Sequence, residues 1–560
     1  MRIFPPLGIE NFMELRTGNY YYVDKTELIE SLLTNVCKVT LITRPRRFGK
    51  TLSMSMLEDF FDISKDSRTH FDGLKISENI ELCANWMNQW PTIFLTLKEV
   101  DGETFEDAYG MLKVVIAELC KKYSFLAEST FVDSDDRELF KELKAQKAAP
   151  ENVKNALKLI TRMMQAHYGK QVIVLIDEYD VPLAKANENG YYRQMLDVIR
   201  ALTGNSLKTN ISLKFAVVTG CLRISKESIF TGANNFVTDS ITGDRFNEYI
   251  GFTQDDVEQL LNTAGLEEHA EEMKEWYDGY RFGAIDVYCP WDVLNHVENL
   301  QRNPKHKPLN YWENTSHNMI IRQFIDREDL WKESQINKDL ETLLAGGTIR
   351  KTIVENLTYD MIHSSADNIW SLLLLTGYLT IVPNEQPNTP LEGAPLRIPN
   401  REVKEIFKAS IKEWFEDKVK SRERSELFSS LWTMDDVKCS EQLSQMVFDT
   451  ISYFDYKEDF YHAYVTGILS FAGYTVKTND EQGEGRPDII LLDERNARAI
   501  VIEVKVADEP ASMDAKCDEA LSQIRRKRYA EPLAKEYLDI FCYGICFYKK
   551  RCAVKSEKFK

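Results

Sequence analysis

An apolar strand that runs into a Gly-Lys-Thr loop and then into a helix is the feature that most restricts the fold of this chain. Residues 39–43 (VTLIT) predict a buried strand, the loop at 44–51 (RPRRFGKT) follows, and residues 52–61 predict a helix. This order is typical of a phosphate-binding loop, in which backbone N–H groups at a helix start bind anionic oxygens. The pattern therefore points to an α/β nucleotide-binding fold.

Single residues of this loop have distinct expected roles. Lys50 is predicted to reach the β and γ phosphates of ATP, and the hydroxyl of Thr51 is predicted to ligate Mg²⁺. The loop backbone is expected to bind phosphate oxygens through Arg47, Phe48 and Gly49. ATP and Mg²⁺ are thus the expected ligands of this part of the chain.

The loop departs from the usual pattern at its first position, where Arg44 replaces a glycine that eases a tight turn. Because Gly-Lys-Thr alone also occurs by chance, a second motif is needed. Residues 171–176 are apolar after the first and end in Asp177-Glu178. Asp177 is predicted to hold Mg²⁺ and Glu178 to orient the attacking water. A buried strand with a polar end is the alternative, but both motifs together predict nucleotide binding, and Glu178 adds hydrolysis.

Further strands fit the same sheet. Residues 92–97 and 213–219 predict two more, each in alternation with helical segments, which implies a parallel doubly wound sheet. Thr219, at the end of the second of these, is our candidate for a side chain that senses the γ-phosphate. Arg223 is a weaker candidate for that role, with a surface loop arginine as the equal alternative.

Near the C-terminus a second constellation of charged residues interrupts apolar strands. Asp488 precedes an apolar run, and the apolar strand at 499–506 contains only Glu503 and Lys505 as charged residues. Adjacent antiparallel strands can bring the two carboxylates together to hold Mg²⁺, or alternatively Mn²⁺. Glu503 and Lys505 lie two apart, so they share a face, where the lysine can orient a water. The pattern predicts metal-dependent phosphodiester cleavage; a surface hairpin is the alternative.

Two further elements near this constellation bear on the prediction. A helix predicted from residue 458 to 471 carries Glu458 and His462 one turn apart on one face. A basic run at 525–528 (RRKR) follows Gln523 on another predicted helix, where these side chains could contact a phosphate backbone. A solvated helix face is the alternative for this run.

Composition limits the remaining possibilities. A chain of 560 residues is too long for one core and suggests about three domains. The net charge of −18 argues against a protein that coats nucleic acid, although a local basic patch is compatible with a nuclease. No run of about 18 apolar residues predicts a membrane span, and the N-terminus lacks the apolar segment of a secretion signal. The ten scattered cysteines are typical of reduced thiols, so a cytoplasmic location is expected.

Four segments are predicted along the chain. Residues 1–250 form the P-loop core, and 251–345, helical in pattern and rich in aromatic residues, form a helical lid. Residues 346–435 form a linking helical or winged-helix-like region with a hairpin, and 436–560 form the nuclease-like domain.

At this point three motifs carry a resemblance to a known family: residues 22–26 (YVDKT), the loop 44–51, and residues 276–280 (WYDGY). Together they resemble the bacterial AAA-ATPase-like family, whose members commonly carry a C-terminal PD-(D/E)XK nuclease-superfamily domain. The two parts cover nearly the whole chain. Arg44 then looks like the family's own form of the loop.

The resemblance implies an AAA-like parallel sheet with a helical lid, which binds ATP through Lys50, Thr51 and Asp177. It also implies a restriction-endonuclease-like α/β domain in which Asp488, Glu503 and Lys505 match the nuclease motif. Glu458 on the preceding helix would be an additional metal ligand. The implied protein is an ATPase and a Mg²⁺-dependent nuclease that acts on nucleic acid, with DNA expected and RNA left open.

Two other functions stay open. The protein could be an ATP-dependent switch or scaffold whose nuclease-fold domain binds nucleic acid or a partner without cutting, or a module that binds nucleotide tightly and hardly hydrolyses it. P-loop ATPases of this type often act as rings, so a homo-oligomer is an open expectation, and no arginine finger can be assigned among Arg46, Arg47 and Arg223.

Overall fold

The computed structural model divides the chain into two compact units, Met1–Ile320 with Gly346–Ile406, and Ile321–Ala345 with Phe407–Lys560. Each unit is described by itself. The residues that the structure describes are 2–34, 37–223, 236–312, 334–383, 392–410, 425–448, 458–469, 474–478 and 485–560. Within these ranges, no helix combines the length and the apolar character needed to cross a membrane.

A five-stranded parallel sheet organises the first unit, with strand order β2-β3-β4-β1-β5. Its strands are β1 (Val39–Thr43), β2 (Thr92–Thr96), β3 (Val172–Asp177), β4 (Leu213–Gly220) and β5 (Phe236–Asp239). The strand of the Gly-Lys-Thr loop thus lies between β4 and β5, and the Asp-Glu strand lies between β2 and β4. Because all strands run in parallel, the predicted polar strand ends meet at one edge of the sheet. The α/β class is confirmed.

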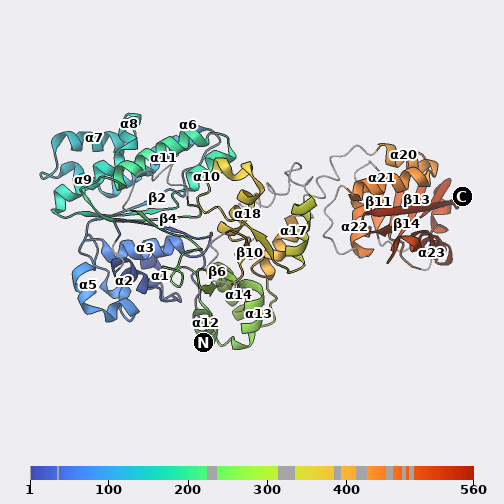
Figure 1. The fold of residues 1–560 in the computed structure, drawn as a ribbon, viewed down its shortest axis with the longest axis horizontal. Helices are drawn as coiled ribbons and strands as arrows, with labels where there is room; N and C mark the ends of the chain where they lie inside the picture. The colour runs from blue at the N-terminus through green and yellow to red at the C-terminus, as the bar shows by residue number, and fades with distance from the viewer. Residues whose placement is uncertain are drawn as a thin grey trace. The chain divides into compact units, whose positions relative to one another are not determined.

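Helices cover both faces of this sheet (Figure 1). Helix α3 (Lys50–Phe61) contacts β2 and β3 on one face, and α9 (Ala156–Tyr168) and α11 (Tyr192–Leu207) cover the other. The other helices around the sheet are α1 (Phe12–Thr17), α2 (Glu27–Thr34), α4 (Arg68–Phe71), α5 (Ile80–Trp86), α6 (Phe105–Lys122), α7 (Ser134–Lys144), α8 (Pro150–Lys154) and α10 (Val181–Glu188).

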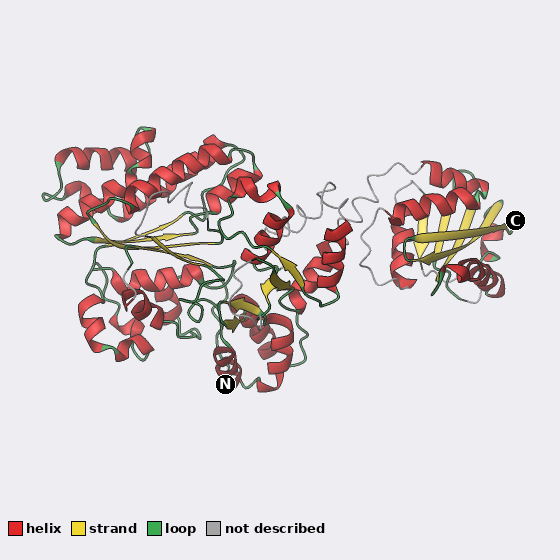
Figure 2. Cartoon of the chain, in the orientation of Figure 1, coloured by secondary structure: helices red, strands yellow, loops and turns green. Residues whose placement is uncertain are grey.

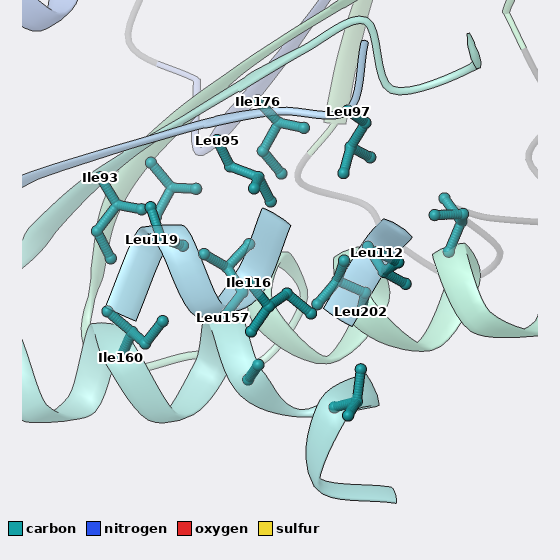
Figure 3. Close-up of a cluster of buried hydrophobic side chains, with 14 of the residues drawn as sticks. Ile93, Leu95, Leu97, Leu112, Ile116, Leu119, Leu157, Ile160, Ile176 and Leu202 are labelled. Atoms are coloured by element: carbon teal, nitrogen blue, oxygen red, sulfur yellow. The ribbon is translucent and has the colours of Figure 1, made fainter. Parts of the chain in front are cut away.

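The main core lies between the sheet and the helices of the second face. Figure 3 shows Ile93, Leu95 and Leu97 of the β2 segment directed toward Ile116 of α6 and Leu157 of α9. All five side chains are almost fully buried. Burial of this apolar surface, at about 25 cal/mol per Å², fixes the sheet on which the polar strand ends depend.

The segment after the sheet is less uniformly helical than its sequence pattern indicates. Helices α12 (Gln254–Ala264), α13 (Ala270–Tyr277) and α14 (Pro290–Arg302) are present as expected. Between the last two, however, β6 (Tyr280–Phe282) and β7 (Ile285–Val287) form an antiparallel hairpin. Within the aromatic run WYDGY, helix α13 ends at Tyr277 and strand β6 begins at Tyr280. Gly279 between them has φ at +95°, which allows the chain to change direction there. The segment predicted as a helical lid thus also contains a short antiparallel hairpin.

The last part of the first unit holds a small antiparallel sheet of order β8-β10-β9. Its elements are β8 (Ile349–Lys351), η4 (Tyr359–Ser364), α18 (Ala366–Leu375), β9 (Thr380–Ile381) and β10 (Ala394–Arg397), and residues 401–410 are helical. The expected hairpin is present, since β9 pairs with β10. The four predicted segment boundaries stay predictions.

The second unit contains a mixed five-stranded sheet of order β11-β12-β13-β14-β15, with helices around it (Figure 2). Only β13 and β14 pair in parallel. Its strands are β11 (Thr475–Thr478), β12 (Ile489–Asp493), β13 (Arg498–Val506), β14 (Asp539–Tyr548) and β15 (Arg551–Lys558), and its helices include α17 (Ser334–Leu344), α20 (Ser425–Thr433), α21 (Asp436–Phe448), α22 (Glu458–Leu469) and α23 (Met513–Arg526). The predicted α/β fold of this part is confirmed.

Candidate functional site

The Gly-Lys-Thr loop leads from the end of β1 to the start of α3. Gly49 caps the helix in the left-handed region with φ at +89°, and Arg47 also has a positive φ, at +68°. A residue with a Cβ is strained at such angles, so the glycine at 49 has a local reason. The turn directs the first backbone N–H groups of α3 into the loop, as the sequence pattern predicts.

Arg44, at the position of the missing glycine, is a structural residue. Its side chain is fully buried, donates to Asp239 Oδ2 at 2.6 Å and to Asn247 Oδ1 at 2.9 Å, and lies over the ring of Phe282. The guanidinium therefore leaves the loop and ties it to the end of β5. An arginine fits here because its charge is paired, and removal of Asp239 would leave it buried and unpaired.

Lys50 lies buried at the start of α3, in contact with its own loop. Its ammonium donates to the carbonyl oxygens of Arg44 at 3.2 Å and Pro45 at 3.1 Å, and it pairs with Glu178 Oε1 at 3.4 Å. Burial would lower the pKa of Lys50, but the acidic groups around it, Glu178 and Asp177 among them, raise it overall. The lysine therefore stays cationic, as a phosphate-binding group must.

Asp177, at the end of β3, is hydrogen-bonded to a threonine at the start of α3 and to another near the end of β4. Its two carboxylate oxygens accept hydrogen bonds from Thr51 Oγ1 at 2.8 Å and from Thr219 Oγ1 at 2.6 Å. Burial, followed by the charge of Glu178, raises the pKa of Asp177. The structure thus brings together Lys50, Thr51, Asp177 and Glu178 with Thr219, from α3, β3 and β4. Their catalytic roles stay predictions.

Glu178, the predicted water-activating residue, follows β3 in a left-handed conformation with φ at +53°. Its Oε1 faces Lys50, whereas its buried Oε2 accepts no hydrogen bond from the residues that the structure describes. Such a carboxylate oxygen has lost water without a protein donor in return, which fits a group that is to bind a substrate water.

A cavity of about 760 Å³ opens beside the loop. It is lined by loop residues from Arg46 to Ser53, by Glu178, and by aromatic and apolar side chains that include Tyr21, Tyr22, Phe252, Trp291 and Leu294. The N-terminal segment reaches it through Pro6, Gly8 and Ile9. A volume of this size, apolar with a few polar groups at one end, suits a nucleotide.

Sequence reasoning did not assign the apolar wall of this cavity to a site. The YVDKT motif supplies Tyr22, Val23 and Lys25 to the lining. This motif, which carries part of the family resemblance, could therefore have indicated that its segment lies at the cavity. Trp291 had no such signal: it lies in the aromatic-rich segment predicted to be helical, and the Arg47 guanidinium lies 4.3 Å from the centre of its ring. Arg223, the weaker sensor candidate, pairs with Glu355 at 3.8 Å.

The nuclease-like constellation of the second unit lies on two neighbouring strands. The antiparallel register pairs Ile489 with Ile502, which places Asp488 opposite Glu503. The backbone N–H of Val504 donates to Asp488 Oδ2 at 2.8 Å. The two predicted carboxylates are therefore neighbours, as the sequence pattern required.

Glu503 is a buried carboxylate of this constellation. Its Oε1 accepts hydrogen bonds from Lys505 Nζ at 3.2 Å and from Gln523 Nε2 on α23. Its buried Oε2 accepts none from any described residue. Burial, followed by the charge of Asp488, raises the pKa of Glu503 to about 7. Gln523 was mentioned beside the basic run, but sequence reasoning did not place it on the carboxylate.

The helix expected beside this constellation is α22. His462 Nε2 donates to the backbone carbonyl oxygen of Asp488 at 2.7 Å, so this part of the helix packs on the predicted metal ligand. Glu458 is the first residue of α22, but its side chain lies outside the described residues, and its predicted role as a metal ligand stays a prediction.

The fit of a divalent cation rests on Asp488 and Glu503. Nowhere in the described part of the chain do three or more His, Cys, Asp or Glu side chains form a group suited to a metal. The pair nevertheless offers a buried carboxylate oxygen without a hydrogen bond and a second carboxylate across the strand pair. Hard oxygen donors of this kind suit Mg²⁺, which commonly keeps several waters and takes only one or two carboxylates.

Comparison with known proteins agrees with this architecture. Residues 6–230 match a family model described as a predicted AAA-ATPase, and residues 456–557 match that of the PD-(D/E)XK nuclease superfamily. A protein of Azotobacter chroococcum mcd 1, named "Uncharacterized protein in vnfD 5'region", is 25% identical over 556 residues, which cover 97% of this chain and 96% of the relative. The resemblance inferred from the sequence motifs is confirmed for both parts of the chain.

Proposed function

We propose that this protein binds and hydrolyses ATP in its first unit and cleaves nucleic acid phosphodiesters in its second. The observation that carries the first half is that Lys50, Thr51 and Glu178 line one cavity of about 760 Å³, with Asp177 hydrogen-bonded to Thr51 beside it. The match of residues 6–230 to a predicted AAA-ATPase supports it.

In the proposed ATPase reaction, the residues of the loop bind and position the triphosphate. Lys50 and the N–H groups at the start of α3 neutralise the phosphate charge. Thr51 and Asp177 would hold Mg²⁺, which supplies further neutralisation of the transferred phosphoryl group when bound. Glu178 accepts a proton from the attacking water, and Thr219, hydrogen-bonded to Asp177, reports on the γ-phosphate.

In the proposed nuclease reaction, Asp488 and Glu503 would hold one or two Mg²⁺ or Mn²⁺ ions, with Glu458 as a further candidate ligand. The metal supplies Lewis-acid stabilisation of the phosphorane-like transition state. Lys505, 3.2 Å from Glu503, orients the nucleophilic water and adds positive charge beside it. We expect DNA as the substrate and the cytoplasm as the location. Formation of a homo-oligomer stays an open expectation.

The proposal is tested with the intact protein on plasmid and single-stranded DNA, with Mg²⁺ or Mn²⁺, with and without ATP. Asp488→Ala should lose metal-dependent cleavage and keep ATP hydrolysis. Asp508→Ala is the matched control, since Asp508 is exposed just after β13. Wild-type protein that hydrolyses ATP but cuts neither DNA nor RNA would contradict the nuclease half.

The alternative is an ATP-dependent switch whose nuclease-fold unit binds nucleic acid or a partner without cutting. The net charge of −18 favours this reading, because it weakens attraction to a phosphate backbone. We also propose that ATP binding or hydrolysis in the first unit controls cleavage by the second, and equal cleavage rates with and without ATP would contradict this coupling.

A further inference from the structure

The two residues after the catalytic pair Asp177-Glu178 hold the turn at the end of β4. Asp180 is fully buried, and its Oδ2 accepts hydrogen bonds from the backbone N–H groups of Cys221 at 3.0 Å and Leu222 at 2.9 Å. The hydroxyl of Tyr179 donates to the carbonyl oxygen of Leu222 at 2.7 Å. One carboxylate and one phenol thus fix both the N–H and the C=O groups of this turn.

This turn has little freedom, and it lies at the nucleotide site. A methyl group on Gly220 would lie 2.6 Å from both Asp180 Oδ1 and the ring of Tyr179, so only glycine fits between them. Thr219, which precedes it, donates to Asp177, and the sulfur of Cys221, which follows it, lies 3.8 Å from Lys50 Nζ. The position of the turn therefore sets the position of two groups that face the loop and the predicted metal ligand.

Asp180, the residue whose carboxylate holds the turn, is also contacted by a segment that comes much later in the chain. The hydroxyl of Tyr359, at the start of η4, lies 3.3 Å from Asp180 Oδ2. Burial, followed by the charge of Asp180, raises the pKa of Tyr359, so the phenol stays protonated and donates. Nearby, Glu355 pairs with Arg223 at 3.8 Å and accepts from Ser240 Oγ at 3.2 Å.

A third contact joins the same segment to the phosphate loop itself. A methyl group on Gly377, which has φ at +92°, would lie 3.0 Å from the Cβ of Pro45. Residues 355–377 therefore contact the turn after β4, the segment after β5 and the phosphate loop. We call residues 355–377 the clamp segment. It lies in the last part of the first unit, before the chain enters the second unit at Phe407.

We propose that Tyr359 is a positioning residue for nucleotide turnover, which acts through Asp180 on the turn 220–222, and that docking of the clamp segment sets the rate of hydrolysis. This inference rests on the proposed ATPase function. Docking of the clamp segment also strengthens nucleotide binding, and because coupling free energies are reciprocal at equilibrium, nucleotide binding stabilises the docked clamp segment. The docking of the clamp segment therefore depends on whether nucleotide is bound to the first unit.

The direct test is Tyr359→Phe, which removes only the hydroxyl. Loss of one hydrogen bond to a carboxylate predicts a fall in kcat of about fivefold or more, and the reciprocal coupling predicts a nucleotide Kd above that of wild type. The matched control is Tyr123→Phe: Tyr123 is also buried, and its hydroxyl donates at 3.0 Å to the carbonyl of Thr92, at the amino end of β2, away from the site edge. The control should keep the wild-type kcat.

A second measurement does not depend on activity. Hydrogen exchange of the peptide that contains Cys221 and Leu222 should be faster in Tyr359→Phe than in wild type, and unchanged in Tyr123→Phe, when the two variants are compared at equal thermal stability. Wild-type exchange in Tyr359→Phe overturns the contact between clamp segment and turn. Faster exchange with a wild-type kcat overturns the positioning role.

The two measurements also separate this inference from the proposed function. If wild-type protein shows no ATP hydrolysis, the proposed ATPase fails, and with it the link to turnover. Exchange at Cys221 and Leu222, measured with and without bound nucleotide, then decides whether the clamp segment still responds to nucleotide. An exchange rate that nucleotide leaves unchanged would overturn that response as well.

Discussion

The two units each bury a carboxylate in a sheet, but they treat it differently. In the first unit, both oxygens of Asp177 accept hydrogen bonds from threonine hydroxyls. In the second, one oxygen of Glu503 is bonded to Lys505 and Gln523, and the other accepts no hydrogen bond from any residue described. The first carboxylate is held in place by neutral hydrogen-bond donors of the protein, whereas the second has one oxygen without a donor among the described residues.

The difference bears on how each site meets its ligand. The hydroxyl donors of Thr51 and Thr219 fix the geometry of Asp177 without an ion, so the proposed nucleotide site is preorganised. Glu503 faces Asp488 in a buried position, and its pKa is raised to about 7. Near neutral pH it can take either a proton or a cation, so occupancy of the second site should depend on pH and on metal.

The largest effect is expected from the removal of the charge at the phosphate loop. Lys50→Met should lower ATP hydrolysis by about 10²–10³-fold, as the loss of one preorganised electrostatic donor does. DNA cleavage measured without ATP should not change. Phosphate release and plasmid cleavage are the two measurements. Lys121→Met, on the exposed face of α6, is the control and should leave both rates intact.

Substitution of the two buried carboxylates should change stability by different amounts. Asp177→Asn turns one acceptor into a donor that faces a hydroxyl, and should lower the unfolding free energy of the first unit by about 1–3 kcal/mol. Glu503→Gln removes a charge whose burial costs stability but leaves Lys505 without its ion partner, so at pH 8 the stability of the second unit should fall by less than that of the first, although metal binding is lost. Calorimetry at pH 8 without metal measures both. A loss of stability in Glu503→Gln equal to that in Asp177→Asn would break the comparison.

The raised pKa of Glu503 should make the stability of the second unit depend on pH. Because the pKa of Glu503 is raised to about 7 from an ordinary value of 4.5, the folded form binds more protons than the unfolded form between these values. Stability of the metal-free unit should therefore fall as pH rises through this window, and it should be lowest above pH 7.

Metal competes with that proton, so Mn²⁺ affinity should rise by about tenfold from pH 6 to pH 8, with proton release on binding. Isothermal calorimetry in buffers of different ionisation enthalpy measures both quantities. In Glu503→Gln the dependence should vanish. A dependence that survives this substitution would assign the titration to another group.

The smallest expected effect concerns a single hydrogen bond of the first site. Thr219→Val keeps the side-chain shape but leaves Asp177 Oδ1 without its donor, and should lower the unfolding free energy of the first unit by about 1 kcal/mol. Urea unfolding measures it. Thr263→Val, on the exposed side of α12, should have a smaller effect. Equal losses in both variants would show that the hydroxyl of Thr219 does not hold Asp177.

Much of the fold and of the candidate sites could be predicted because the signals are local. The apolar strands, the Gly-Lys-Thr turn and the polar strand ends are patterns within about ten residues, and parallel pairing then brings the strand ends to one edge. The same holds for Asp488 and Glu503, which two adjacent strands place opposite each other. The hairpin β6–β7 was missed because its strands have only three residues each, too short for a clear period.

Other parts of the sites could not be predicted, because they depend on contacts between distant segments. Arg44 pairs with Asp239 across 195 residues, which no periodicity shows. Gln523 meets Glu503 only because α23 packs against β13, and Trp291 meets Arg47 only because α14 comes close to the loop. Tyr359, which we propose as a positioning residue, was not singled out at all.

The sequence by itself determined the two α/β units, the phosphate loop, the acidic strand ends and the pair of carboxylates beside Lys505, since short-range patterns encode strands, turns and the faces of side chains. Only the tertiary structure decided which carboxylate oxygens have a hydrogen-bond donor. Both oxygens of Asp177 accept hydrogen bonds, whereas one oxygen of Glu503 accepts none from any described residue. Burial and partners from distant segments fix the free energy of each charge, and the neighbouring residues in the sequence do not show them.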